Sequence, residues 1–87
     1  GVAEIYKTAN KKFIFALLEL DANLIDIEKV ENKGDTRKFV FCFSTATEED
    51  NEKIDKAKQD NKEYTNSEFN LMHDIYWKLI RNKFPKK

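Results

Sequence analysis

Glycine, proline, cysteine and histidine are scarce in this chain of 87 residues, which contains two glycines and one residue of each of the other three types. Gly1 and Gly34 stand apart, so the glycine-rich loop that binds phosphate groups is missing and nucleotide binding has no support. One cysteine and one histidine cannot supply the usual four ligands of a zinc site. We therefore expect no metal, no cofactor and no recognisable catalytic residue.

Long hydrophobic runs and a net charge are also lacking. No stretch approaches the roughly 20 apolar residues of a membrane-spanning helix, and the N-terminus shows no basic-then-apolar signal pattern. Sixteen basic residues balance sixteen acidic ones, which removes the simplest electrostatic argument for binding nucleic acid or an anionic membrane. Cys42 cannot form an internal disulfide of the kind that small secreted domains usually need. These observations predict a soluble cytoplasmic protein with no membrane partner.

The chain does contain enough apolar material for one small core. Hydrophobic residues make up 40% of the sequence and include seven phenylalanines, each of which buries a large area when it packs. A chain of this length has room for a single domain, residues 1–87, whose stability should be modest because a small domain buries a smaller share of its surface.

The first two elements are indicated by short hydrophobic repeats. Residues 2–7 alternate as a brief strand does, and we expect this strand at an edge of a sheet. Thr8 or Asn10 can cap a following helix over residues 11–20. At 100° per residue that helix carries a wide apolar stripe, which predicts the most buried helix of the protein. The stripe contains Phe13, Ala16, Leu17 and Leu20, widened by Ile14 and Leu18.

A period of two then replaces the helical period and predicts a β-hairpin. In its first strand Ile25 and Ile27 should face one side of the sheet. Residues 32–36 supply turn chemistry between the two strands. The other side of the first strand should carry Leu24, Asp26, Glu28 and Val30.

The second strand of the hairpin has apolar residues on both faces. Phe39, Phe41 and Phe43 alternate with Val40 and Cys42. We expect helix 11–20 to cover the phenylalanine face, because it is the nearest apolar surface of suitable size. The face of Val40 and Cys42 would then need a second layer or a partner.

Two more helices complete the chain. Thr47 followed by three carboxylates is a good helix start, and the helix over residues 48–63 should lie on the surface because Ile54 and Ala57 are its only apolar anchors. Thr65 or Ser67 caps a last helix over residues 67–84, closed by Pro85. The predicted fold class is α+β, a small antiparallel sheet packed with three helices in the order β-α-β-β-α-α. The core stripe of the last helix should contain Phe69, Met72, Ile75, Tyr76, Leu79 and Ile80.

The residues that could carry chemistry have structural explanations. His73 has no nucleophile specified beside it, so a packing role is expected. Cys42 sits inside a strand, where a cysteine acts as a small hydrophobe unless a positive charge lowers its pKa. The acidic cluster at residues 48–55 lacks the glycine and the ligand spacing of a calcium loop. The strand phenylalanines are similar to the base-stacking aromatics of RNA-binding sheets, but burial in the core is the stronger expectation.

A basic end of the last helix is the one charge asymmetry of the sequence. Lys78, Arg81 and Lys83 follow Asp74 with no further acidic residue. The helix dipole alone favours such residues at a C-terminus. Trp77 lies beside them and is of the residue type that often anchors interfaces. We therefore take Trp77, Lys78, Arg81 and Lys83 as the candidate partner-binding residues.

Several short segments, read together, resemble a known family. The sequence is similar to small bacterial and phage proteins catalogued only as a domain of unknown function. The resemblance implies a threonine-capped helix that leads into a strand hairpin, and it extends through Tyr64 and the final helix. Asp21-Ala22-Asn23 stands where these proteins tend to carry a glycine. The resemblance implies no activity, and it rests on Tyr6-Lys7-Thr8, Ala16-Leu17-Leu18, Leu24-Ile25-Asp26-Ile27-Glu28 and Phe39-Val40-Phe41.

Three function classes stay open at this point. The first is a non-enzymatic binding or regulatory module with an unidentified protein partner, of phage or mobile-element origin, because the sequence specifies a fold and no site for chemistry. The second is a nucleic-acid-binding accessory protein that uses the basic C-terminal helix. The third is a small enzyme without a recognisable motif. A homodimer through the Val40 and Cys42 face, or through an open sheet edge, is also predicted.

Overall fold

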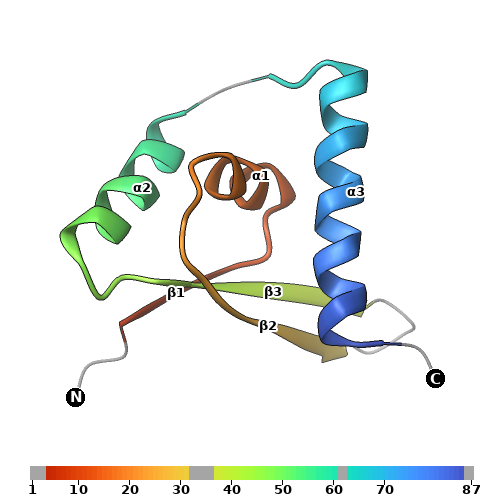
Figure 1. Cartoon of the computed structure of the whole chain (residues 1–87), viewed down its shortest axis with the longest axis horizontal. Coiled ribbons are helices and arrows are strands. Elements are labelled where there is room, and N and C mark those ends of the chain that lie inside the picture. Colours follow the sequence, from red (N-terminus) through yellow and green to blue (C-terminus); the bar gives the residue numbers. More distant parts are fainter. Residues whose placement is uncertain (1–3, 32–36, 61–62, 86–87) are drawn as a thin grey trace.

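The computed structural model describes residues 4–31, 37–60 and 63–85. The predicted α+β class and the order β-α-β-β-α-α are confirmed (Figure 1). The expected turn at residues 32–36 lies outside the described residues. The elements are β1 (Ile5–Thr8), α1 (Lys11–Glu19), β2 (Leu24–Glu31), β3 (Arg37–Ser44), α2 (Glu48–Gln59) and α3 (Asn66–Lys83).

The three strands form one antiparallel sheet in the order β1-β3-β2, so β3 is central and β1 is the edge strand that the sequence predicted. Figure 1 shows α1, α2 and α3 on the same side of this sheet, with α1 between the other two. Among the described residues no helix or strand covers the opposite face. We call that face the open face of the sheet.

The core lies between the phenylalanine face of β3 and α1. Phe41 and Phe43 are fully buried together with Phe15 and Leu17, which confirms that the first helix covers this face. α3 closes the core from the side, since Tyr76 stacks on Phe41 with ring centroids 5.0 Å apart. Burying each such ring stabilises the fold by about 1.5–3 kcal/mol, so a few aromatic residues account for much of the core.

Helix starts follow the capping signals of the sequence. Of the two candidates before α1, the cap is Asn10, whose side chain accepts from the Phe13 amide at 3.1 Å. Thr47 caps α2, which ends at Gln59, so the expected extent to residue 63 was wrong. Asp60 takes an extended conformation there, and its backbone N–H donates to the carbonyl of Ala57. Thr65 caps α3 in a capping box with Glu68.

The turn after α1 places Asp21 at a φ of 60°. This left-handed conformation favours glycine, and aspartate is among the few other residues that adopt it at low cost. Asp21 begins the Asp21-Ala22-Asn23 segment, where the resembled family tends to carry a glycine. At this point the backbone therefore has a conformation that glycine adopts more easily than other residues do.

A bulge in β2 overturns part of the predicted strand pattern. Ile27 pairs with Phe41 on the helix side, but Leu24, which was expected on the other side from Ile27, pairs with Phe43 and lies on the helix side too. The register shifts between Leu24 and Asp26, which leaves Ile25 as the extra residue, 50% exposed. A bulge resets the alternation of side chains, so a strict period of two was the wrong reading before Asp26.

The core stripe of α3 is narrower than predicted. Met72, Tyr76 and Ile80 are buried, and Leu79 is half-buried. Phe69 and Ile75 were also expected in the core, yet they are 37% and 38% exposed. Ile75 lies on one flank of the buried stripe. Phe69 lies on the stripe itself, near the start of the helix, where its ring meets that of the buried Phe15 edge to face with centroids 5.4 Å apart.

Candidate functional site

The structure separates the four predicted partner-binding residues into different surfaces. Trp77 and Arg81 lie one turn apart and line the same cleft. Lys78 is exposed and does not line it. Lys83 lies on another flank of α3, where its Nζ contacts Oδ1 of Asp26 at 2.8 Å. The four residues therefore do not form one basic patch.

The cleft around Trp77 has a volume of about 400 Å³ and lies between the sheet and the end of α3. Lys29 and Phe39 pair across β2 and β3 and supply its floor. Trp77 and Arg81 supply one wall from α3. The chain then turns back after the helix, which brings Phe84 within 6.0 Å of Phe39, centroid to centroid. The lining residues are Lys29, Phe39, Trp77, Ile80, Arg81, Phe84 and Pro85.

Trp77 is held in place by its neighbours. Its ring meets that of Phe39 edge to face, with centroids 5.7 Å apart and an angle of 83°. Its indole Nε1 donates a hydrogen bond of 2.9 Å to Nε2 of His73. The ring of His73 also stacks on that of Tyr76. His73 therefore fixes the tryptophan, a packing role of the kind expected for it.

Positive charge is the second property of this cleft. Lys29 and Arg81 are its charged lining residues, and the described lining includes no carboxylate. A guanidinium group binds a carboxylate or phosphate through two parallel hydrogen bonds. Aromatic rings beside it offer an apolar surface of fixed shape. The arrangement is suited to a ligand that carries an anionic group next to an apolar or aromatic one.

Sequence reasoning missed three members of the cleft. Phe39 was expected chiefly as a core residue, with base stacking as the weaker alternative, and Lys29 was not singled out. Phe84 drew no attention, since it lies at the predicted helix end. The spacing of Trp77 and Arg81, four residues apart, was a signal that these two share a helix face. Nothing in the sequence indicated that β2 and β3 would meet that face.

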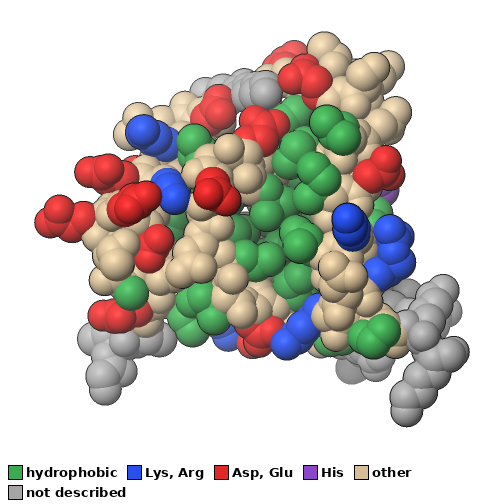
Figure 2. Space-filling model, viewed as in Figure 1, with side chains coloured by type: hydrophobic (Ala, Val, Ile, Leu, Met, Phe, Trp, Pro, Cys, Tyr) green, Lys and Arg blue, Asp and Glu red, His purple; other side chains and the backbone are tan. Residues whose placement is uncertain are grey.

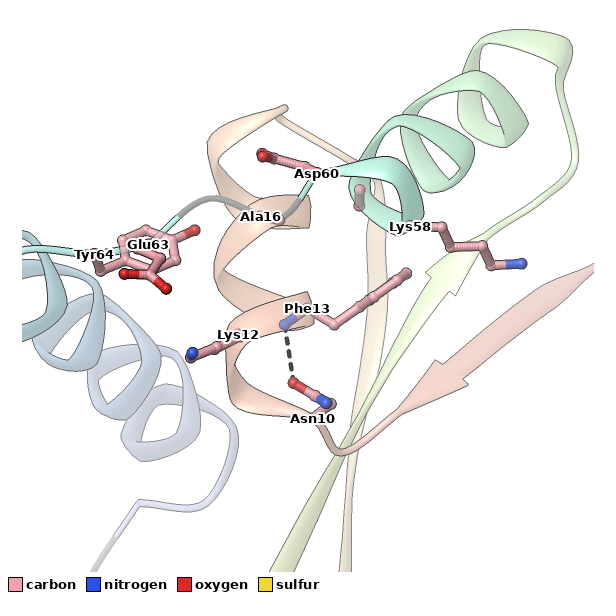
Figure 3. Close-up of a pocket in the computed structure, with 9 residues that line it drawn as sticks. Asn10, Lys12, Phe13, Ala16, Lys58, Asp60, Glu63 and Tyr64 are labelled. Carbon is pink, nitrogen blue, oxygen red and sulfur yellow. Dashed lines mark hydrogen bonds between the residues drawn. The ribbon is translucent and has the colours of Figure 1, made fainter.

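A second hollow of about 400 Å³ lies between α1, the end of α2 and the segment before α3 (Figure 3). Its charges are mixed, with Lys12 and Lys58 against Asp60 and Glu63. Nζ of Lys58 sits over the ring of Tyr6 at 5.1 Å, and in Figure 3 this side chain points away from the carboxylates. The lining includes no serine, cysteine or histidine among the described residues.

The residues that could react or bind metal are placed unfavourably for either role. Cys42 is 2% exposed, and burial raises the pKa of its thiol, which disfavours the reactive thiolate. The acidic residues Glu48, Glu49 and Asp50 form the first turn of α2, where they face the positive end of the helix dipole. Within the described ranges, no three histidine, cysteine or carboxylate side chains gather as metal ligands.

Comparisons with known proteins add no relative. No family model, no curated protein and no solved structure matches the chain. The resemblance to the bacterial and phage family therefore stays a prediction. Separately, no helix in the described part of the chain is both long and apolar enough to cross a membrane.

Proposed function

We propose that this chain is a non-enzymatic binding module that holds a protein partner in the cleft around Trp77. The observation that carries the proposal is the meeting of three aromatic rings with two cationic side chains in one cleft. The ligand that fits is a peptide segment in which an aspartate or glutamate lies next to a large apolar residue. The apolar side chain would pack between Phe39, Trp77 and Phe84, and the carboxylate would bind Arg81 or Lys29.

The separation of the basic residues favours a peptide over a nucleic acid. Tracking a phosphate backbone needs several cations along one surface. Here Lys83 is turned away from Arg81 and engaged with Asp26. Among the described residues the cleft thus offers two cations and no extended basic path, which is the pattern that a single carboxylate requires.

Selection from a random peptide library on the immobilised protein tests the proposal. We expect enriched peptides to pair an acidic residue with Phe, Leu or Trp. A synthetic copy of an enriched peptide is then titrated against the protein while the emission of Trp77, the single tryptophan, is recorded. Arg81→Glu should weaken binding roughly ten- to hundredfold, the range of one charge-assisted hydrogen bond. Lys78→Glu makes the same charge change outside the cleft and should leave binding unchanged.

Several results would contradict the binding-module proposal. Equal weakening by Arg81→Glu and Lys78→Glu would place the ligand elsewhere or make the attraction nonspecific. A single-stranded oligonucleotide that shifts Trp77 emission, with an affinity that falls steeply with salt, would favour the nucleic-acid alternative if no peptide is enriched. Reproducible turnover of a metabolite by the pure protein would show an enzyme instead.

A further inference from the structure

A row of apolar side chains lies uncovered on α3, away from the aromatic cleft. Leu71, Ile75 and Leu79 are spaced by four residues and therefore share one stripe of the helix, which we call the α3 strip. Leu71 is 62% exposed and Ile75 38% exposed. Leu79 adjoins Leu24 and Ile25 in a shallow hollow at the bulge of β2. In Figure 2, hydrophobic side chains gather between α1 and α3 and continue down to β2.

The open face of the sheet, where a partner was expected from the sequence, has exposed apolar residues only at opposite ends of β3 among the described residues, Ile5 on β1 and Val30 on β2. Cys42 is already buried there, because Lys7 and Glu28 form an ion pair that reaches from β1 to β2 across β3. Val40, opposite Glu28, is half-buried. Charged residues thus cover the apolar centre of that face, whereas the α3 strip has no such cover.

The charges beside the α3 strip make it complementary to itself. The strip is centred on Ile75, so two copies of α3 packed antiparallel would set Ile75 against its symmetry mate and Leu71 against Leu79. Asp74 and Lys78 lie on one flank of the strip, on either side of its centre. A twofold axis at Ile75 brings Asp74 of each copy next to Lys78 of the second copy. The zero net charge of the chain adds no repulsion between copies.

We propose that the α3 strip binds a second copy of this chain, forming a twofold homodimer with antiparallel α3 helices. Such an interface is isologous, with the same surface used on both copies. Trp77 lies about 200° around the helix from Ile75 at 100° per residue, so the aromatic cleft stays open in the dimer. Dimerisation and peptide binding are therefore separate properties that can fail independently.

Sedimentation velocity over micromolar to several hundred micromolar protein tests the dimer. We expect the unmodified chain to dimerise with rising concentration, and Ile75→Lys to remain monomeric. Val30→Lys is the matched control, because Val30 is 40% exposed and lies on the open face of the sheet. It should dimerise as the unmodified chain does. Circular dichroism of each variant checks that the fold is retained.

Charge exchange tests the predicted orientation without disturbing the core. Asp74→Lys and Lys78→Asp should each weaken dimerisation about tenfold or more, since each places like charges together twice in the interface. The double exchange should restore it. A folded unmodified chain that stays monomeric throughout the concentration range overturns the proposal. A dimer that Val30→Lys disrupts, or that both single exchanges leave intact, overturns it as well.

Discussion

Trp77 and His73, the single tryptophan and the single histidine of the chain, are joined by a hydrogen bond of 2.9 Å from the indole Nε1 to the imidazole Nε2. An imidazole nitrogen accepts a hydrogen bond only when it carries no proton, so this arrangement places the proton of neutral His73 on Nδ1. The bond fixes the orientation of a ring that lines the cleft. Because Trp77 is the single tryptophan and lines the cleft, its fluorescence reports on changes there.

His73 should hold Trp77 in place. His73→Phe keeps an aromatic ring at this position but removes the acceptor of the Trp77 hydrogen bond. We expect the substitution to lower the free energy of unfolding by about 1 kcal/mol, the net value of one hydrogen bond, and to change the emission of Trp77 in the folded protein. Urea denaturation and emission spectra of the two proteins at one pH provide the check. An emission spectrum and a stability that both stay unchanged would contradict the assignment.

Thr65 should stabilise α3 and Ser67 should not. The Thr65 hydroxyl accepts from the Glu68 amide at 3.1 Å, and the Glu68 carboxylate accepts in return from the Thr65 amide at 3.2 Å. Thr65→Ala should lower the free energy of unfolding by about 1 kcal/mol, the usual cost of a lost helix cap. Ser67→Ala, in the exposed first turn, should change it by less than about 0.5 kcal/mol.

Urea denaturation of the two variants measures this difference directly. The sequence could not choose between these caps, because both residues precede the apolar stripe and both carry a hydroxyl. If Ser67→Ala proves the more costly substitution, α3 begins two residues later than it does in this structure.

Periodicity predicted the element order because each element buries one face in a core. The alternation of Phe39, Phe41 and Phe43 was enough to predict a covered strand face, and the stripe of α1 was enough to predict its cover. What periodicity could not supply was the break at Ile25, since the bulge depends on how β2 meets the end of β3. The exposure of Ile75 likewise depends on how closely the neighbouring elements approach that side of α3.

The candidate site was predictable only in its helical half. Trp77 and Arg81 are four residues apart, and that spacing alone places them on one face of a helix. Lys29 and Phe39 join them through long-range packing of β2 and β3 against α3, which leaves no trace in local sequence. The contact of Lys83 with Asp26 could not be predicted either, because Asp26 is distant in the chain.

The ion pair between Lys83 and Asp26 should make the free energy of unfolding depend on pH in the acid range. The hydrogen bond from Lys83, and next the one from the Ile27 amide, lower the pKa of the Asp26 carboxyl below its ordinary value of 3.8. A carboxyl group whose pKa is lower in the folded than in the unfolded protein stabilises the fold. This contribution is fully present above the ordinary pKa and is lost as the pH falls through the folded-state pKa. We expect Lys83→Met to lower the thermal midpoint slightly at pH 7, since both groups are half exposed, and by less as the pH falls below 3.8.

Lys38→Met is the matched control for this effect, because it removes the same charge from an exposed position on β3 that contacts neither Asp26 nor the α3 strip. Its thermal midpoint relative to the unmodified protein should not vary between pH 7 and pH 2. A difference for Lys83→Met that persists unchanged at pH 2 would mean that Asp26 is not the group responsible.

Cys42 should react slowly with a thiol reagent in the folded protein. Removing the side chain of Glu28 should raise the reaction rate more than removing that of Lys7. The side chains of Lys7 and Glu28 meet across β3 and shield the thiol. Burial is the main cause of its raised pKa, followed by the charge of Glu28, whereas Lys7 acts to lower it. Glu28→Ala therefore both uncovers the thiol and lowers its pKa, and the two effects add. Lys7→Ala uncovers it but removes a cation that favours the thiolate, and the two effects oppose.

The rate of reaction with a disulfide reagent at neutral pH measures this order. We expect the rate to rise several-fold, up to about tenfold, in Glu28→Ala, because reactivity follows both exposure and thiolate fraction. The rise in Lys7→Ala should be smaller. Lys29→Ala serves as the control, since Lys29 pairs with Phe39 on the opposite face of the same sheet and should leave the rate unchanged. A faster reaction in Lys7→Ala than in Glu28→Ala would show that access alone governs the reaction rate of Cys42. A rate in the folded protein equal to that in the unfolded chain would show that the ion pair does not shield the thiol.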